Sequence, residues 1–452
     1  MANDSEIAHG PSPEPNERYT TDLVRDHRTD AQRDRDRVLY SAQFARLAEI
    51  TQVISPEHGY VFHNRLTHSL KVAQIARRIA QRILEENERD ATLTADLPDV
   101  VEAAALSHDL GHPPFGHATE VELNKLVQDA GVRDGFEGNA QSFRIIARLA
   151  ASDALTLKNS GAEDEHEESV PGLNWTRQCL DSVLKYPWGF AENPTYPKKW
   201  GFYDSEKVIF DWVRKDQPKL RRCLGAEIID WADDITYAIH DLLDFFRSGK
   251  IPIDRLRTDK MERLRFLNGT FNRKPDWEKD EAEYATALSN LIEQFPFHPE
   301  RRFTDSNEHH RSLQLFATSL IRPFVQAITY VASAAPGRSV APIDPVARRQ
   351  VELLKQFTWH YIILDRDLAL AQAGQRKAVR TVFRKLLLAV RRQDLHFFPA
   401  VIRESLDWNY IMDRIGVATD DSDVRFVADY IAGMTEKELM RVYRTMEGVA
   451  GG

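Results

Sequence analysis

The residues of this chain with the most evident capacity for chemistry lie in one short motif. A His-Asp pair, His108 and Asp109, ends an apolar stretch, and two further histidines, His112 and His117, flank a Pro-Pro turn. Imidazole and carboxylate groups removed from water need partners, because an unpaired polar group inside a protein is costly. One metal ion would satisfy several of them at once. The motif therefore predicts a metal site.

Two distant parts of the sequence offer residues that would complete this site. His68 follows Arg65 by three positions, so both side chains share one face of a predicted helix. Asp233, Tyr237 and Asp241 recur every four positions and line one face of another helix. If these helices converge on the motif, two imidazoles and two carboxylates surround one cation.

Ligands of this mixed nitrogen and oxygen kind suit the divalent metal ions Mn, Mg, Fe, Co, Ni and Zn and do not distinguish among them. On a six-coordinate ion they leave positions for water and a phosphate oxygen, which metal-assisted hydrolysis requires. Taken alone, His68 would be a buried, hydrogen-bonded histidine and Tyr237 a packing residue. Asp233 and Asp234 would be a surface pair. Their combination favours the metal site.

The elements that position these residues are predicted to be helices, because apolar residues recur at helical spacing through most of the chain. Regular alternation typical of strands is scarce, so the expected fold class is all-α. Gly111 and the Pro-Pro turn end the helix that precedes the motif. Helices are expected at 66–83, 100–110, 139–157, 204–222, 227–246, 281–294, 309–333, 346–372, 375–392 and 435–447.

One large helical core is expected, followed by a smaller carboxy-terminal part. Residues 1–20 are polar and rich in proline, which predicts a disordered tail. Residues 161–172 are acidic and predict an exposed, mobile loop. Residues 334–345 contain three prolines and predict a connector. We therefore expect the core at 21–335 and a helical region packed on it at 336–452.

Bulk composition excludes several classes of protein. The chain has 452 residues and 42% hydrophobic content, enough for a large core, and a net charge of −9 argues against a mainly electrostatic nucleic-acid binder. Two cysteines without a Cys-x-x-Cys motif argue against a disulfide framework or a cysteine zinc site. Neither a bilayer-spanning apolar stretch nor a signal-peptide core is present, so we expect a cytoplasmic protein without a membrane partner.

The order of these residues resembles that of the HD superfamily of metal-dependent phosphohydrolases. The sequence around them resembles that of the deoxynucleoside triphosphate (dNTP) triphosphohydrolases, the dGTPase-like family. Most specific is His-Asp-Leu-Gly-His-Pro-Pro-Phe-Gly-His at 108–117 joined to Glu-Gly-Asn-Ala-Gln at 137–141. The resemblance runs from about residue 30 to residue 445 and includes further matches at 35–37, 44–47, 51–53, 65–69, 172–176, 185–187, 232–237 and 429–435.

The resemblance implies an HD-domain helical core with additional carboxy-terminal helices. It also implies a set of metal ligands, namely His68, His108, Asp109 and Asp233. Asp233 is preferred over Asp234 because it lies one helical turn before Tyr237, whose counterpart in the family lies against the deoxyribose. The implied reaction is hydrolysis of a dNTP, such as dGTP, to deoxynucleoside and tripolyphosphate.

His117 and Glu120 resemble the catalytic His-acid pair of the family. An imidazole can move a proton at the reacting phosphate, and a neighbouring carboxylate fixes its tautomer. Whether His117 positions or deprotonates the water, or protonates the departing 5′-oxygen, stays open. The alternative is a histidine that caps the Pro-Gly turn.

Further residues are implied as contacts of the substrate. The triphosphate requires cationic groups; Arg65 is the strongest candidate, whereas Arg46 and Lys185 have structural ion pairs as an equal alternative. His112 is expected either to contact the metal ligands without binding the metal itself or to line the substrate channel.

Three residues are implied at the sugar. Gln52 corresponds to the family residue that contacts the 3′-hydroxyl, and Tyr237 under the ribose would leave no room for a 2′-hydroxyl. Asp241 is a further candidate for the sugar, with a helix-surface carboxylate as the alternative.

The expected protein is thus a dNTP triphosphohydrolase that forms a homo-oligomer, with an allosteric dNTP site left open. One alternative keeps the metal site in a nucleotide phosphodiesterase or 5′-nucleotidase. Another is a catalytically weak protein that senses dNTPs or binds single-stranded nucleic acid. The complete set of ligand and catalytic residues weighs against this last alternative.

Overall fold

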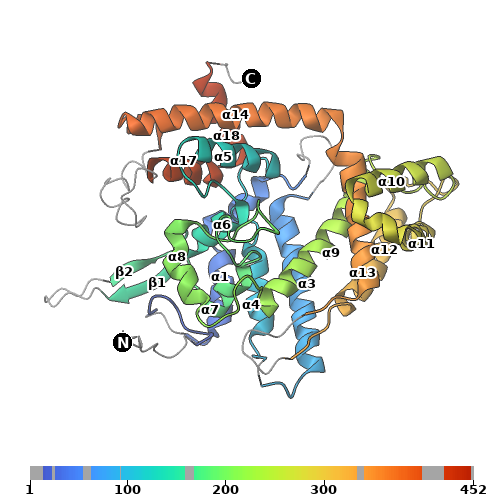
Figure 1. The fold of residues 1–452 in the computed structure, drawn as a ribbon, viewed down its shortest axis with the longest axis horizontal. Helices are drawn as coiled ribbons and strands as arrows, with labels where there is room; N and C mark the ends of the chain where they lie inside the picture. Colours follow the sequence, from blue (N-terminus) through green and yellow to red (C-terminus); the bar gives the residue numbers. More distant parts are fainter. Residues whose placement is uncertain are drawn as a thin grey trace, which may run out of the picture.

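The fold is almost entirely helical (Figure 1). The computed structural model describes residues 14–22, 26–53, 63–91, 93–157, 167–332, 341–399 and 422–448. Among them, no helix combines the length and apolar character that crossing a membrane would need. The predicted all-α fold class is confirmed, with one β-hairpin in addition.

The elements fall into an amino-terminal and a carboxy-terminal series. The first series consists of α1 (Asp30–Leu39), α2 (Ala42–Arg46), η1 (Leu47–Glu49), α3 (Arg65–Glu86), α4 (Leu97–Ser107), α5 (His117–Asp129), α6 (Gly138–Arg144), η3 (Ile145–Leu149), β1 (Ala151–Leu157), β2 (Glu167–Pro171), α7 (Arg177–Val183), η4 (Asp204–Glu206), α8 (Lys207–Val213) and α9 (Leu224–Arg247). The second consists of α10 (Lys260–Arg273), η5 (Pro275–Asp280), α11 (Glu281–Gln294), α12 (Asn307–Gln326), α13 (Pro345–Thr358), η6 (Trp359–Ile363), α14 (Arg366–Arg391), η7 (Leu395–Phe397), α17 (Ser422–Gly433) and α18 (Glu436–Met446).

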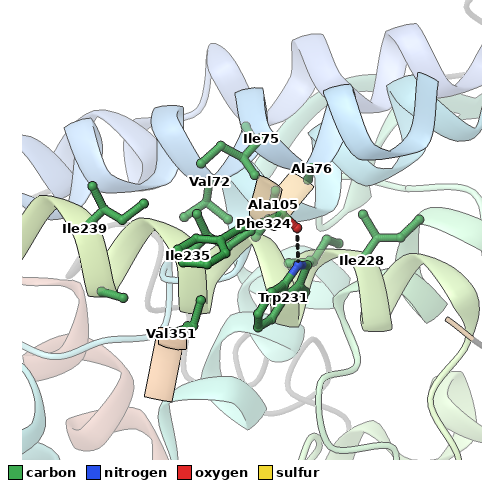
Figure 2. Packing of buried hydrophobic residues seen from close by; sticks show 14 of the residues in the cluster. Val72, Ile75, Ala76, Ala105, Ile228, Trp231, Ile235, Ile239, Phe324 and Val351 are labelled. Carbon is green, nitrogen blue, oxygen red and sulfur yellow. Dashed lines mark hydrogen bonds between the residues drawn. The ribbon is translucent and has the colours of Figure 1, made fainter. Parts of the chain in front are cut away.

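Three helices, α3, α4 and α9, pack against one another in the middle of the molecule. Their apolar faces are buried in one core, in which Figure 2 shows Val72 of α3 and Ile235 of α9. The buried Trp231 indole donates a hydrogen bond of 2.9 Å to the Phe324 carbonyl of α12. This bond satisfies a polar group that would otherwise be costly to bury. Helices α3 and α9 carry His68 and Asp233, and the end of α4 leads directly into His108 and Asp109.

A second core joins the carboxy-terminal helices to α5. Leu123 and Val127 of α5 pack in one cluster with Val382 of α14 and Ile431 of α17. The long helix α14 crosses the top of the molecule in Figure 1, with α5, α17 and α18 packed against it. Because α5 begins at His117, this second core supports the helix that starts in the motif.

The amino-terminal segment differs from its prediction in part. Residues 1–13 of the predicted tail lie outside the described residues, whereas 14–22 lie against α1. Arg18 approaches Asp34 to 2.6 Å with both side chains buried, and Arg37 pairs with Asp22. Buried ion pairs of this kind hold the segment on α1.

The helix predicted at 139–157 is wrong in its second half. After α6 and the single π-helical turn η3, the chain forms β1, which pairs antiparallel with β2, so the hairpin also takes residues from the predicted acidic loop. Gly172 then approaches η3 so closely that a Cβ atom would lie 2.5 Å from the Ala147 carbonyl oxygen. Pairing between the two strands overrides the weak helical spacing of this segment.

Candidate active site

The first turn of α3 presents one predicted ligand and one predicted phosphate contact. The Asn64 side chain caps the helix by accepting a hydrogen bond of 2.9 Å from the backbone N–H of Thr67. Helical spacing then places Arg65 and His68 on one face, and both side chains are buried. The cap therefore fixes where the first imidazole lies.

The His-Asp pair follows the end of α4 in a turn that contacts α6. Gly111 approaches α6 so closely that a Cβ atom would lie 2.1 Å from the Gly138 carbonyl oxygen. Ser142 of α6 accepts a hydrogen bond from Gly111 N–H and donates one to the His108 carbonyl, both of 2.9 Å. The two most specific parts of the sequence motif thus contact each other, and their contact fixes the turn that carries His108 and Asp109.

On α9, the two neighbouring aspartates point to different partners. Asp233 Oδ1 lies 3.0 Å from His68 Nε2. Asp234 Oδ1 instead accepts a hydrogen bond of 2.9 Å from the Lys355 ammonium of α13. Successive residues on a helix are about 100° apart, so only one of the two can face the imidazole. The structure places Asp233 there.

The four predicted ligands lie together, and we call His68, His108, Asp109 and Asp233 the four-donor cluster. Ligand atoms of the first three lie within 4.8 Å of one another. Asp233 Oδ1 is 3.0 Å from His68 Nε2 and 3.8 Å from His108 Nε2. His108 Nδ1 lies 2.6 Å from the Ala105 carbonyl, which directs Nε2 into the cluster. Two imidazole nitrogens and two carboxylate oxygens form a donor set that fits a divalent metal ion.

Neighbouring cations keep both carboxylates of this cluster ionised. Burial alone would raise the pKa of Asp109, but the Arg65 guanidinium, 2.8 Å away, outweighs it and holds the pKa well below its usual range. Burial likewise opposes ionisation of Asp233, and the Lys185 ammonium at 3.0 Å lowers the pKa of that group well below its usual range. Both groups are therefore charged at neutral pH, as metal ligands must be.

A second group, the His117 cluster, consists of His112, His117 and Glu120. Its ligand atoms also lie within 4.8 Å of one another. His117 Nδ1 is 2.8 Å from Glu120 Oε2 and its side chain is 71% exposed, whereas the Glu120 side chain is 8% exposed. His112 Nδ1 lies 3.1 Å from Asp109 Oδ1, which links the His117 cluster to the four-donor cluster. An exposed imidazole held by a buried carboxylate suits proton transfer to a bound molecule.

The buried imidazole of His112 should make stability depend on pH. Burial, together with Arg65, lowers the pKa of His112 to about 4. Below about pH 6.5 the unfolded chain binds a proton that the folded protein excludes, so the free energy of unfolding falls as the pH drops toward about 4. Between about pH 7.5 and about pH 5, we expect this loss to be about 2 kcal/mol smaller in His112→Gln than in the wild type. Urea unfolding with a chelator present measures it, and equal losses in both proteins would contradict the expectation.

The predicted phosphate contacts are not equally available. Arg65 donates to Asp109, while its Nε has no hydrogen-bond partner among the described residues. Lys185 lies at the edge of the four-donor cluster, where it pairs with Asp230 and Asp233, each at 3.0 Å. Arg46 donates instead to the carbonyls of residues 110, 112 and 434. Its guanidinium therefore connects backbone segments through carbonyl groups, which is a structural role but not the ion pair given as the alternative.

The predicted sugar contacts include two buried oxygens to which no described residue donates a hydrogen bond. Gln52 Oε1 and Asp241 Oδ2 have no hydrogen-bond partner in the part of the chain that the structure describes. Burial raises the pKa of Asp241 well above its usual range, and the nearby Asp244 and Asp233 add to this. Tyr237 lies one helical turn before Asp241 on α9, and burial raises the pKa of its phenol. Buried polar atoms without partners are uncommon in proteins and suggest groups that a ligand would satisfy.

Sequence reasoning missed one cation beside the His117 cluster. The Lys199 ammonium lies 3.2 Å from Glu120 and 2.7 Å from Glu137. Burial raises the pKa of Glu137, and the Lys199 ammonium lowers it by less, so the pKa stays above its usual value. Lys199 belongs to the long connection between α7 and α8, where no periodic pattern in the sequence indicates the direction of a side chain.

Comparison with known proteins places the chain in a family. Residues 65–238 match the HD domain, and residues 342–445 match the phosphohydrolase-associated domain. A deoxyguanosinetriphosphate triphosphohydrolase-like protein of Corynebacterium efficiens is 33% identical over 94% of this chain and 93% of its own length. A protein of the same description from Streptomyces coelicolor is 40% identical over 59% of this chain and 58% of its own length. One from Shewanella pealeana is 29% identical over 93% of this chain and 92% of its own length.

The matched HD domain contains the whole four-donor cluster, which lies between residues 65 and 238. Similarity to the Corynebacterium protein extends over nearly the full length of both chains. The chain therefore belongs to the deoxyguanosinetriphosphate triphosphohydrolase-like family of HD-domain, metal-dependent nucleotide hydrolases.

Proposed function

We propose that this protein hydrolyses deoxynucleoside triphosphates to deoxynucleoside and tripolyphosphate. The observation that carries the proposal is the four-donor cluster, with the exposed imidazole of His117 beside it. The relatives described as deoxyguanosinetriphosphate triphosphohydrolase-like support the substrate class. The proposal does not distinguish among Mn, Mg, Fe, Co, Ni and Zn, because mixed nitrogen and oxygen ligands suit them all.

The four-donor cluster would hold one divalent ion. Such an ion lowers the pKa of a bound water and offsets the negative charge of a phosphate. His68 and His108 would bind through Nε2, since Asp233 and the Ala105 carbonyl direct those atoms into the cluster. Arg65 keeps Asp109 ionised and oriented for the same ion.

The His117 cluster would handle the proton. Water attacks the α-phosphorus, the bond from that atom to the 5′-oxygen breaks, and the departing oxygen must gain a proton. His117 is placed either to take the proton of the attacking water or to supply one to the 5′-oxygen. Glu120 fixes the imidazole through Nδ1, so Nε2 is the atom that remains for this transfer.

The remaining residues would bind the substrate around the reacting phosphate. Arg65 and Lys185 provide positive charge next to the four-donor cluster, where a triphosphate would lie. Gln52 and Asp241 each offer a buried oxygen that a sugar hydroxyl would satisfy. Tyr237, between Asp233 and Asp241 on one face of α9, would pack against the deoxyribose.

Analysis of the products tests the proposal. The protein is incubated with a divalent metal and each of the four dNTPs, singly and in mixtures, and phosphorus NMR identifies the products. Tripolyphosphate with deoxynucleoside is the expected result. Pyrophosphate or orthophosphate as the first product would contradict it and favour a phosphodiesterase or 5′-nucleotidase. Activity only in mixtures would support an allosteric dNTP site. We also propose that the protein forms a homo-oligomer, which native mass spectrometry tests.

Substitution of Tyr237 tests how ribonucleotides are excluded. In Tyr237→Ala the ring no longer fills the space beside C2′, so discrimination of dGTP over GTP should fall by about 1–3 kcal/mol, or roughly 10- to 200-fold in the ratio of kcat/KM values. Tyr237→Phe keeps the ring and is the matched control, with discrimination close to that of the wild type. An unchanged ratio in Tyr237→Ala would remove this residue from the sugar site.

A further inference from the structure

A carboxylate from the carboxy-terminal helices bonds to two segments beside the proposed active site. Glu436, the first residue of α18, accepts hydrogen bonds of 2.7 Å from Thr51 N–H and 2.8 Å from the Thr51 hydroxyl. It also accepts one of 3.2 Å from Phe115 N–H. One side chain therefore connects Phe115 of the HD domain to Thr51, which precedes that domain in the sequence.

Each of these segments leads directly to a residue of the proposed site. Thr51 precedes Gln52, whose buried Oε1 has no partner among the described residues. Phe115 comes two residues before His117 and has φ +67°, in the left-handed region that non-glycine residues rarely adopt. Such a conformation persists only where surrounding contacts hold it. The bond from Phe115 N–H to Glu436 is one of these contacts.

A third segment meets the other two at the same place. Arg65 N–H donates a hydrogen bond of 3.1 Å to the Ile50 carbonyl, just before Thr51. Gly116 packs against Arg65, since a Cβ atom there would lie 3.0 Å from Nη2. Displacement of either bonded segment would therefore also disturb the guanidinium that orients Asp109.

Arg46 provides a second connection between the carboxy-terminal helices and the region of the proposed site. Arg46 donates to the Met434 carbonyl at 3.0 Å and to the Leu110 and His112 carbonyls at 2.8 Å. The link between α17 and α18 thus holds α18 against the His-Asp turn independently of Glu436. Loss of the Glu436 carboxylate alone should leave α18 attached.

We propose that Glu436 is a positioning residue for the dNTP reaction. It fixes the positions of Gln52 and His117 relative to each other. The inference rests on the proposed function. Glu436 would touch neither substrate nor reacting atoms; it acts through the Thr51 and Phe115 backbones. The phosphohydrolase-associated region, which supplies Glu436, would thereby take part in substrate selection at the HD domain.

Three variants separate positioning from a merely structural role. Glu436→Ala removes the acceptor of all three hydrogen bonds, and Glu436→Gln keeps one amide oxygen as an acceptor. Glu438→Ala is the matched control on the same turn, because Glu438 accepts a hydrogen bond only from the N–H of Thr435, the N-cap of its own helix, among the bonds of the described residues. For each variant, kcat and KM are measured with dGTP and with its 3′-deoxy analogue, together with metal content and melting temperature.

In Glu436→Ala we expect kcat/KM for dGTP to fall by about 10- to 100-fold, because small displacements of catalytic groups have effects of this size. The preference for dGTP over its 3′-deoxy analogue should fall as well, metal content should stay at the wild-type level, and Glu436→Gln should recover part of the loss. Glu438→Ala should keep wild-type kcat/KM and preference.

Two results would overturn the inference. One is wild-type kcat/KM and sugar preference in Glu436→Ala. The other is a loss matched by Glu438→Ala or accounted for by lost metal or unfolded protein. A wild-type protein that releases no tripolyphosphate from any dNTP, singly or in mixtures, would instead overturn the proposed function, and this inference with it.

Discussion

Replacement of Asp233 by alanine is expected to abolish both metal binding and hydrolysis while the helical fold persists. Asp233 Oδ1 faces both imidazoles of the four-donor cluster, so the variant loses a charged donor and not only volume. Metal affinity should fall by more than about 100-fold, because loss of a group that only hydrogen-bonds to a metal ligand already lowers the affinity by about 10- to 100-fold. Alanine favours helix, and Lys185 keeps its pair with Asp230, so α9 should remain folded.

The neighbouring aspartate provides the matched control for this prediction. Asp234→Ala removes a carboxylate that pairs with Lys355 of α13, on another face of α9. Mass spectrometry of bound metal, circular dichroism and dGTP turnover are measured on both variants. Asp234→Ala should keep its metal. Wild-type metal content in Asp233→Ala, or loss of metal in Asp234→Ala alone, would show that the ligand assignment is wrong.

His117→Ala is expected to lower kcat by about 100- to 10,000-fold, the range typical of a lost general acid or base. Metal content should stay near the wild-type level, because His117 belongs to the other cluster and not to the four-donor cluster. This pattern, slow turnover with metal retained, distinguishes the residue from Asp233. The rate of tripolyphosphate release and bound metal are the two quantities to measure.

His310→Gln is a suitable control for the effect of removing an imidazole. His310 pairs with Asp305 at the start of α12, and its replacement should leave kcat unchanged. If His117→Ala also kept wild-type turnover, the imidazole would have no part in the reaction. If neither wild type nor variant turned over dNTPs that both bind, the alternative of a catalytically weak dNTP-sensing protein would be favoured.

The long helices were predictable because their buried faces are regular. Residues 281–294 were expected as a helix and form α11, and α9 contains the whole of the predicted 227–246. By contrast, α10 lies in the highly charged segment at 254–310 and buries only Phe266, Thr270 and Phe271, so its periodicity is weak. Helix α17 is absent from the predicted helices although its pattern is visible in the sequence. The apolar residues at 424, 427, 428 and 431, which are buried, recur at helical spacing.

Breaks between elements were harder to predict than the elements. The helix expected at 346–372 is divided at Asp365, whose side chain caps the next helix by accepting from the N–H groups of Asp367 and Leu368. The new helix, α14, then continues to Arg391 and crosses to the second core. A cap within an apolar run competes with continued periodicity, and tertiary packing decides between them.

The residues expected as ligands came from short motifs, whereas their supporting contacts depend on the path of the chain. Charge alone made Arg46 a candidate for phosphate, but its guanidinium is bound to three carbonyls. Lys199 reaches the site region from a segment with no motif of its own, and Glu436 stands just beyond the match at 429–435, outside every motif used to choose site residues. Pairs separated by tens or hundreds of residues leave no periodic pattern, so single-sequence reasoning has no means to find them.

If distant side chains meet around one catalytic metal ion, anomalous diffraction from crystals of Mn-loaded protein should locate that ion among them. We expect one dominant anomalous peak within bonding distance of all residues of the four-donor cluster. A dominant peak within the His117 cluster, or manganese bound away from His68 and Asp233, would contradict it.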